Sequence, residues 1–275
     1  MNIEVLVAAM NQSDHSLVNR MNISSDAIIG NQCDKNSVES YEIDGKQISY
    51  YNFAERGVGL NRNNTLMRAT GDILVFADDD ECFFDNYEEI IKEAYSKIPK
   101  ADAIIFNIET IGADVGRRNI TKIFKLNIFN SLNYGAVRLT VKNSCVKRAN
   151  VNFHRQFGGG TTFSSGEDTL FIADLIKKGL RIYTYPATIA SVNQETSTWF
   201  NGYNEKYFYD RGSLFKALSP KAAKLLCWLL LLKNKKRFFG ENISFRQGWN
   251  LAKSGMKGFV NGISYDEWRK KAEKN

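Results

Sequence analysis

The chain has 275 residues, of which 43% are hydrophobic and 12% aromatic. This composition excludes a disordered or fibrous protein and predicts a globular fold with a sizeable core. The net charge of +7 is unevenly placed: residues 201–275 hold 16 Lys or Arg against 6 Asp or Glu, whereas residues 1–200 hold 21 against 24. A near-neutral body with a basic end indicates an anionic partner, for which nucleic acid, an anionic membrane surface and a diphosphate substrate all qualify.

The cysteines and the N-terminal segment predict a cytoplasmic location. The four cysteines are far apart and form no CxxC pair, so we expect reduced thiols in a reducing compartment. The opening residues lack the basic segment and cleavage site of a signal peptide and predict a first strand. The longest apolar run, 225–232, is about half of the roughly 18 residues that span a bilayer.

Strand and helix patterns alternate along the first hundred residues, and further ones lie at 103–108 and 168–192. Apolar or β-branched runs predict strands at 3–9, 26–30, 47–53, 73–77, 103–108 and 181–192, and helical patterns lie at 15–22, 61–69, 85–97 and 168–178. This alternation predicts an α/β fold, with a Rossmann-like and mainly parallel sheet flanked by helices. Ligands of such sheets bind at the carboxyl ends of the strands.

The rest of the chain follows other patterns. Residues 112–165 mix short strand patterns with a run of three glycines, and we expect an antiparallel section and a mobile loop there. The last part is basic, with helical patterns at 220–239 and 245–260. We therefore expect an α/β domain over 1–200 and a basic, C-terminal helical extension over 201–275.

Three consecutive aspartates follow the strand predicted at 73–77. Asp78, Asp79 and Asp80 repel one another unless a cation or hydrogen-bond donors offset their charge. Mg²⁺ and Mn²⁺ prefer oxygen ligands and bridge protein carboxylates to phosphates, so the cluster predicts a divalent-metal site. The alternative is a solvated acidic turn that caps the next helix.

The stretch 56–80 resembles family 2 glycosyltransferases. In that family a Gly-containing loop leads to a helix with Arg-Asn, then to Ala-x-Gly-Asp/Glu, a strand and Asp-x-Asp. Here Arg62-Asn63, the turn 69–72 and Asp78-Asp79-Asp80 take these places in the same order and spacing. Downstream, Gly166-Glu167-Asp168 is similar to the family's Gly-Glu-Asp at a helix start.

The resemblance extends over about residues 3–192 and implies both a fold and a reaction. The fold is GT-A, so that 1–200 is the nucleotide-sugar-binding and catalytic domain. The reaction is an inverting transfer from a nucleoside diphosphate sugar to an acceptor hydroxyl. Mn²⁺ or Mg²⁺ would neutralise the charge of the leaving diphosphate.

The resemblance also implies roles on the donor side. Asp80 is expected to ligate the metal directly, and Asp78 to bind the ribose or the metal through water. Asp79, in the same donor-binding cluster, is expected to point away, because alternate residues of an extended chain face opposite sides. Arg62 is expected to contact the diphosphate or the base; its alternative is a surface arginine on a helix.

The acceptor side requires a base, and Asp168 is the candidate by family position, with Glu167 second. A carboxylate serves when it lies within hydrogen-bond reach of the attacking hydroxyl. The structural alternative, which can hold at the same time, is negative charge at the N-terminus of the helix that starts there.

Two segments depart from the family pattern where it normally faces the nucleoside. The family's Pro-x-Tyr-Asn is replaced by Ala9-Met10-Asn11-Gln12, and its Asp-Asp-Gly-Ser by Asn31-Gln32-Cys33-Asp34. Asn11 and Asp34 are the donor-binding candidates there. Asp34 can bind a uracil or thymine edge, and a UDP-sugar is the favoured donor.

Few residues can complete a metal site. His15 and His154 are the only histidines, which excludes a multi-histidine site. Where many relatives have a loop that closes over the donor, this chain has Gln194 and Glu195, each a candidate third metal contact. Trp199 either stacks on a sugar or packs in the core.

Residues 220–239 combine an apolar stripe with a basic end, which fits a helix in a membrane interface. The alternative is a helix packed on the domain with its charged end solvated. Membrane contact would suit a polyprenyl-diphosphate-linked glycan acceptor, as in bacterial polysaccharide assembly, and a peripheral place on the inner face of the cell membrane. We expect no nucleic acid, because no recognisable reading motif accompanies the basic run.

Other functions are open alternatives. A sugar nucleotidyltransferase needs a Gly-rich loop with Arg and Lys after the first strand, where 10–13 contains neither. A haloacid-dehalogenase phosphatase has its Asp-x-Asp directly after the first strand, whereas the cluster in this chain lies at 78–80. The alternative from another class is an inactive GT-A relative that binds glycan or scaffolds a membrane assembly. The presence of Asp78, Asp80 and Asp168 argues against it.

Overall fold

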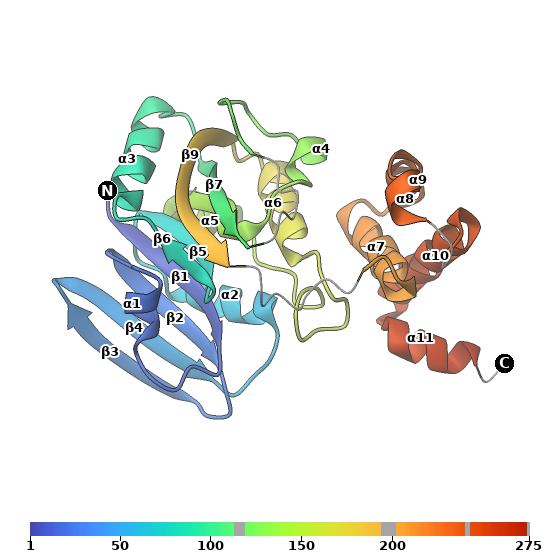
Figure 1. Cartoon of the computed structure of the whole chain (residues 1–275), viewed down its shortest axis with the longest axis horizontal. Helices are drawn as coiled ribbons and strands as arrows, with labels where there is room; N and C mark the ends of the chain where they lie inside the picture. Colours follow the sequence, from blue (N-terminus) through green and yellow to red (C-terminus); the bar gives the residue numbers. More distant parts are fainter. Residues whose placement is uncertain (113–118, 194–201, 240–242, 274–275) are drawn as a thin grey trace. The chain divides into compact units, whose positions relative to one another are not determined.

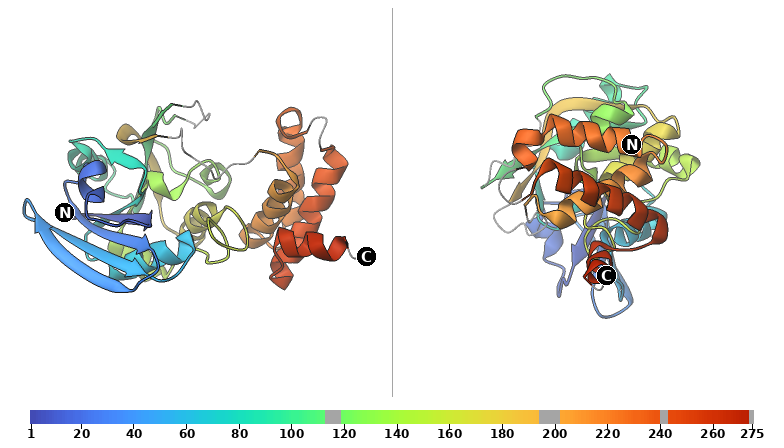
Figure 2. Two further views of the ribbon diagram at one scale, coloured as in Figure 1. Left: turned by 60° about the horizontal axis from the view of Figure 1, so that its bottom comes forward. Right: turned by 90° about the vertical axis from the view of Figure 1, so that its right-hand side faces the viewer.

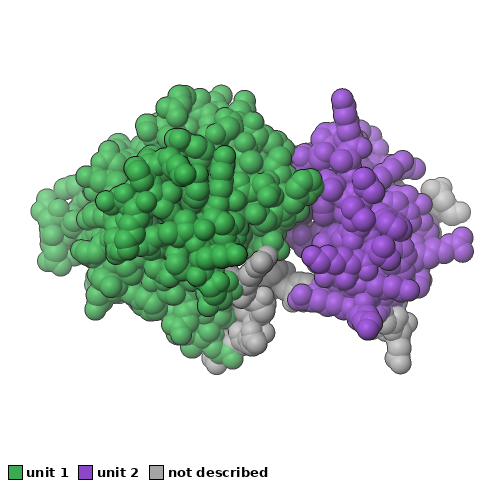
Figure 3. Space-filling model, turned by 90° about the horizontal axis from the view of Figure 1, so that it is seen from above, with its two compact units in different colours: residues 1–154, 171–197 green, residues 155–170, 198–275 purple. Residues whose placement is uncertain are grey.

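The computed structural model describes residues 1–112, 119–193, 202–239 and 243–273. The chain divides into two compact units, which Figure 3 shows in green and purple. Unit 1 comprises residues 1–154 and 171–197, and unit 2 comprises residues 155–170 and 198–275. Unit 1 is built on a β-sheet and unit 2 on helices.

The described part of unit 1 has a nine-stranded sheet with the order β3-β4-β2-β1-β5-β8-β7-β9-β6 (Figure 1). Strands β4, β2, β1 and β5 are parallel neighbours, and β7 is parallel to β9. Strands β3, β6 and β8 run antiparallel to their neighbours. The prediction of a mainly parallel sheet is confirmed. The strands are β1 (Ile3–Met10), β2 (Asp26–Gln32), β3 (Ser37–Ile43), β4 (Lys46–Phe53), β5 (Ile73–Asp78), β6 (Glu81–Phe83), β7 (Ala103–Ile111), β8 (Leu139–Lys142) and β9 (Ile182–Asn193).

Apolar side chains project from both faces of the sheet, and those of each face pack into a separate hydrophobic core. Along β1, Val5 and Val7 belong to one core and Leu6 to the other, as the alternation of a strand requires. The first core includes residues of α1 (Leu17–Arg20) and α3 (Tyr87–Lys97). The second includes residues of α2 (Val58–Arg68), α5 (Asn143–Ala149) and α6 (Glu167–Lys177). Two short helices, α4 (Ile128–Ser131) and η1 (Ala136–Arg138), lie between β7 and β8 in the chain.

The parallel neighbours β4, β2, β1 and β5 end at the same edge of the sheet. The register places Ala8 of β1 beside Asp78 of β5, and Asn31 of β2 beside Asn52 of β4. The segments that follow these four strands therefore start next to one another, although they are far apart in the sequence. This edge is where a ligand of a parallel sheet is expected.

The two edge strands of the described sheet, β6 and β3, were not predicted. Strand β3 is the longer of the two. It pairs antiparallel with β4 through a tight turn at Asp44 and Gly45, whose φ angles are 49° and 76°. Two positive φ values in succession are typical of the type I′ hairpin turn, for which Asp-Gly is a strong sequence signal. Most of the strand is exposed, so hydrophobic periodicity alone does not indicate it.

Unit 2 contains the helices of the C-terminal region, coloured orange to red in Figure 2. The described helices there are α7 (Glu205–Leu218), α8 (Ala223–Lys233), α9 (Lys235–Phe238), α10 (Phe245–Asn261) and α11 (Tyr265–Ala272). The helix predicted at 245–260 is confirmed as α10, whereas the pattern at 220–239 forms two helices separated at Asn234. Among the described residues, no helix is long and apolar enough to cross a bilayer.

Helices α7 and α10 approach backbone to backbone. A Cβ atom on Gly212 would lie 1.9 Å from the carbonyl oxygen of Ala252, and one on Gly255 would lie 1.8 Å from that of Tyr209. The Ser213 hydroxyl donates to the Gly255 carbonyl at 2.9 Å. Each helix thus presents a glycine to the other, and a larger residue at either position would force the helices apart.

Candidate active site

The acidic cluster lies where β5 ends at the sheet edge. Ile73 to Ala77 are at most 1% exposed, and the chain emerges from the core at Asp78. Asp79 and Asp80 form the turn that leads into β6. The side chain of Asp78 is 40% exposed, and Asp80 is exposed. The buried strand therefore places carboxylates at the edge where parallel sheets generally bind their ligands.

Asp78 is held by a buried arginine. Arg62 of α2 is 2% exposed, and its Nη2 atom donates to Oδ1 of Asp78 at 2.6 Å. The guanidinium carbon lies 5.4 Å from the centre of the Phe153 ring. The next residue, Asn63, bonds both the N–H and the C=O of Phe153, which fixes this part of α2. The interpretation of Arg62 as a surface arginine is wrong, because its charge faces the acidic cluster from inside.

Asp79 points to the segment after β1. Its Oδ2 atom accepts the Met10 N–H at 3.2 Å and the Gln12 side-chain N–H at 3.0 Å. Burial raises the pKa of the Asp79 carboxyl, and the charge of Asp78 acts in the same direction, whereas the two hydrogen bonds lower it. In this structure Asp79 fixes the neighbouring loop.

A network of amides, which the sequence did not reveal, joins the ends of three strands. Asn31 is 1% exposed; it accepts the Gln12 N–H at 2.9 Å and donates to the Gln12 carbonyl at 2.9 Å and to Asn52 at 2.7 Å. Arg20 donates to the Gln12 side chain at 2.7 Å. The one available signal was an asparagine at the end of an apolar strand. The network gives the loop after β1 a fixed conformation.

The two candidates for nucleoside contact lie beside this network. Asn11 is exposed and adopts a left-handed conformation with φ of 53°, and its N–H donates to the Gln32 carbonyl at 2.9 Å. The Asp34 side chain is 96% exposed and pairs with Arg56 at 2.8 Å. Arg56 also donates to the Cys33 carbonyl at 2.7 Å. Asn11, Asp34 and Arg56 thus follow three adjacent strands at the same edge.

The donor set at this edge fits a metal only together with a ligand. Among the described residues, no group of three or more His, Cys, Asp or Glu side chains is arranged to hold an ion. Asp78 and Asp80 supply carboxylates to which a bound diphosphate would add oxygens, and Mg²⁺ is bound by proteins in this way, through one or two carboxylates and substrate phosphates.

Glu167 and Asp168 lie in unit 2, in the first turn of α6. The Glu167 carboxylate accepts the Gly166 N–H at 3.1 Å. Both residues place negative charge at the N-terminal end of the helix, which its dipole favours. The aspartates at 78–80 belong to unit 1.

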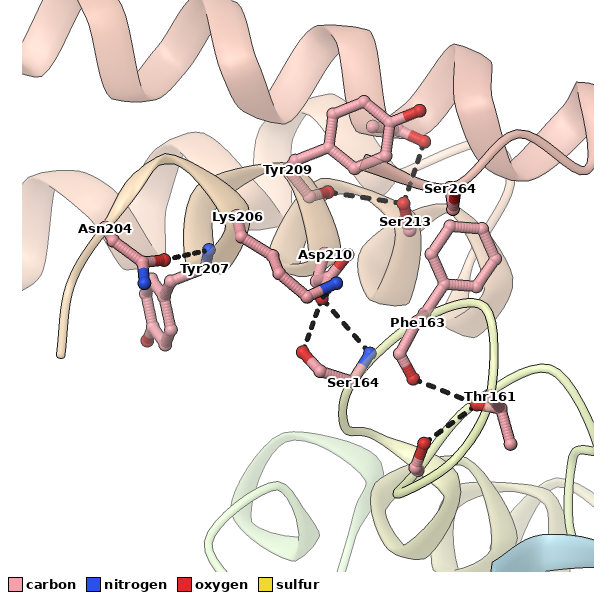
Figure 4. A network of polar contacts seen from close by, with 12 residues as sticks. Thr161, Phe163, Ser164, Asn204, Lys206, Tyr207, Tyr209, Asp210, Ser213 and Ser264 are labelled. Atoms are coloured by element: carbon pink, nitrogen blue, oxygen red, sulfur yellow. Dashed lines mark hydrogen bonds and ion pairs between the residues drawn. The ribbon is translucent and has the colours of Figure 1, made fainter. Parts of the chain in front are cut away.

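The segment before Glu167 is bonded to helix α7 (Figure 4). Asp210 of α7 is 4% exposed and accepts hydrogen bonds from the Ser164 hydroxyl and, at 3.1 Å, from the Ser164 N–H. Lys206 lies 3.2 Å from the same carboxylate. The Thr161 hydroxyl donates to the carbonyls of Gly158 and Phe163. Residues 158–164 are thus held by internal bonds and by one buried carboxylate.

The remaining candidates do not join these groups. The ring of His15 lies tilted against that of Tyr41, with 4.7 Å between the ring centres, and its Nε2 atom lies 3.1 Å from the Glu39 carboxylate. Burial lowers the pKa of His154, and its carbonyl lies against Gly59. Gln194, Glu195 and Trp199 lie outside the described residues.

Residues 34–152, somewhat less than half of the chain, match the model of the family described as glycosyl transferase family 2. This match contains Arg62, Asp78 and Asp80. The segment that contains these residues is similar to family 2 glycosyltransferases. The resemblance inferred from the sequence is confirmed, and so is the enzyme class, a glycosyltransferase. No curated protein matches the glycosyltransferase sequence.

Solved structures share the fold of this glycosyltransferase. The structure of S. aureus TarS 1-349 in complex with UDP-GlcNAc is 10% identical, with a TM-score of 0.61, and the match covers 96% of this chain and 93% of that chain. TarS 1-349 alone is 12% identical over the same shares, with a TM-score of 0.62. The complex of TarS 1-349 with UDP is 12% identical, with a TM-score of 0.57. The GT-A fold is thereby confirmed.

The pairing of Arg62 with Asp78 can be measured by a double-mutant cycle. We expect Arg62→Gln and Asp78→Asn to have non-additive effects on the free energy of unfolding, with a coupling of about 1–2 kcal/mol. The coupling free energy is expected to be small, because the Asp78 side chain is more than one-third exposed and water screens the pair. Chemical denaturation of the four proteins provides the measurement. Additive effects would show that the contact contributes nothing to stability.

The bonding of Ser164 to Asp210 predicts a local effect. Asp210→Ala removes the acceptor of the Ser164 N–H and hydroxyl, which costs about 1–3 kcal/mol when such groups remain buried. We expect faster amide hydrogen exchange in residues 157–166, measured by mass spectrometry. Asp210→Asn keeps an acceptor oxygen and is the control, with a smaller increase. Equal exchange in Asp210→Ala and wild type would contradict the anchoring.

Proposed function

We propose that this protein is an inverting glycosyltransferase that moves a sugar from a nucleoside diphosphate donor, favourably a UDP-sugar, to an acceptor hydroxyl. The observation that carries the proposal is the family 2 match over residues 34–152, which contains the acidic turn and Arg62. The carboxylates lie at the carboxyl edge of a parallel sheet, where such folds bind nucleotides.

The donor proposal is supported by the edge formed by β4, β2, β1 and β5. TarS was solved with UDP-GlcNAc and with UDP, which supports the uridine nucleotide as the first donor to test. We assign nucleoside contacts to Asn11 and Asp34, which follow adjacent strands there. The Arg56 guanidinium holds Asp34 and provides positive charge beside the base or ribose.

For the metal we assign Asp80 as the direct protein ligand, with Asp78 as a ligand through water or a ribose contact. The paired Arg62 supports this division, because it occupies one oxygen of Asp78 while Asp80 lies exposed in the turn. When bound, Mn²⁺ or Mg²⁺ would neutralise charge on the diphosphate. Arg62 adds fixed positive charge behind the carboxylates, and Asp79 keeps the loop after β1 in place.

For the acceptor we assign Asp168 as the base that takes the proton of the attacking hydroxyl, with Glu167 as the second candidate. The Gly-Glu-Asp sequence at a helix start supports this assignment, and the buried Asp210 carboxylate holds the segment that leads to it. Residues 1–200 then form the catalytic domain, and residues 201–275 a basic helical extension.

The acceptor we propose is a lipid-linked glycan of a bacterial polysaccharide pathway, reached from the inner face of the cell membrane. The charge of residues 201–275 supports this acceptor class, because 16 basic and 6 acidic residues favour an anionic partner.

Asp80→Asn tests the metal assignment. We expect Mn²⁺-dependent turnover of a panel of nucleoside diphosphate sugars, followed as release of the nucleoside diphosphate, to fall at least 100-fold. Asp44→Asn is the matched control, because Asp44 is exposed in the β3–β4 turn at the opposite edge of the sheet. Turnover in Asp80→Asn equal to that of Asp44→Asn would reject the assignment.

Asp168→Asn tests the base. Its amide cannot accept the proton, so we expect transfer to fall about 100-fold or more, while the dissociation constant of the donor, measured by calorimetry, stays close to that of wild type. Glu167→Gln provides the comparison and is expected to retain more activity. Unimpaired transfer by Asp168→Asn, with normal donor binding, would contradict the base assignment.

A further inference from the structure

Helix α8 has two apolar faces, and the described part of the chain covers one of them. Ala223, Cys227 and Leu231 are at most 2% exposed, on the side that packs against α7. The other face is exposed by 39–60%, at positions spaced i, i+3, i+4 and i+7, which are Leu225, Trp228, Leu229 and Leu232. One face of α8 thus packs on the protein, and the opposite face is available for a membrane interface. We call the four exposed residues the α8 stripe.

The α8 stripe is surrounded by positive charge. From Ser219 to Phe239 the sequence has six cations and no Asp or Glu. At 3.6 residues per turn, Lys224 and Lys233 lie about 90° to either side of the stripe. The other four cations are exposed as well: Lys221 precedes the helix, and Lys235, Lys236 and Arg237 follow it in α9.

We propose that the α8 stripe and its cations bind the surface of an anionic bilayer. The leucines and Trp228 would enter the boundary between headgroups and acyl chains, and the lysines would face lipid phosphates. The helix has 11 residues, about 17 Å in length, and therefore lies in the interface instead of spanning it. The inference rests on the proposed function for its purpose, since a lipid-linked acceptor requires an enzyme at the membrane.

Charge decides between a bilayer and a second copy of the chain as the occupant. A two-fold contact through the α8 stripe would bring the same cations of both copies together, and like charges across an interface are unfavourable. An anionic lipid surface offers the opposite charge to the same residues. An exposed apolar patch rimmed by polar residues marks an interaction surface, and the positive rim here selects the anionic one.

Vesicle co-sedimentation of the full-length protein tests the surface. We expect binding to vesicles of phosphatidylglycerol and phosphatidylcholine, weaker binding to phosphatidylcholine alone, and release at high salt. Leu225→Asn/Leu229→Asn should lower the partition coefficient at least tenfold. Val260→Asn, at a residue of α10 that is 65% exposed, is the control and should bind like wild type.

A second variant separates charge from apolar contact. Lys235→Gln/Lys236→Gln should lower binding to anionic vesicles about 25-fold, about fivefold for each charge, and leave binding to phosphatidylcholine unchanged. Circular dichroism and thermal unfolding confirm that each variant is folded. The proposal is overturned if wild type does not bind anionic vesicles, if the leucine variant binds equally well, or if ultracentrifugation shows a dimer that this variant dissociates.

Donor turnover without vesicles, measured on the same proteins, keeps this proposal apart from the proposed function. We expect the leucine variant to bind UDP and turn over donor in solution like wild type, because the stripe belongs to unit 2 and the acidic turn to unit 1. Vesicle binding without any donor turnover would reject the proposed function and leave the membrane surface standing. Donor turnover without vesicle binding would reject the membrane surface and leave the proposed function standing.

Discussion

The candidate active site depends on the parallel pairing of β4, β2, β1 and β5. Parallel strands end at a common edge, so segments separated by up to about seventy residues in the sequence begin side by side. The register fixes their heights, with Asp78 next to Ala8 and Asn31 next to Asn52. A slip of one residue would turn Asp78 to the other face of the sheet and separate it from Arg62.

The elements that could be predicted are those whose pattern is decided by burial. β1 is apolar except for Glu4, and β5 is apolar up to Asp78, because helices cover both faces of the sheet. The apolar stripe of α3 is equally clear. Strand β3 has no such stripe, since most of it faces water, and only the Asp44-Gly45 turn could have indicated it. The break between α8 and α9 was not predicted for a different reason. The residues on both sides of Asn234 are good helix formers, so the helical pattern continues across the break.

The sequence predicted which residues make up much of the candidate site, but not the hydrogen bonds and ion pairs between them. The spacing from Arg62 to Asp78 identified both residues, but not that the arginine is buried and bonded to the aspartate. Gln12 and Asn31 carry no motif of their own, and only the fold brings their amides together. Likewise, Asp210 lies over forty residues beyond Ser164, and helical periodicity gives no reason to pair them.

Three adjacent aspartates avoid mutual repulsion by occupying three environments. Asp78 is neutralised by the guanidinium of Arg62 from the interior, so its charge is compensated without a metal. Asp79 is desolvated, and burial raises its pKa, but the bonds from Met10 and Gln12 favour its ionised form. Asp80 remains exposed, where solvent screens its charge. The repulsion within the turn is thus offset by protein groups and by solvent. Under the proposed function, a cation with phosphates would meet an Asp78 that Arg62 holds and a loop that Asp79 fixes. Preorganisation of this kind would lower the cost of binding, because less of the protein would have to become ordered around the ligand.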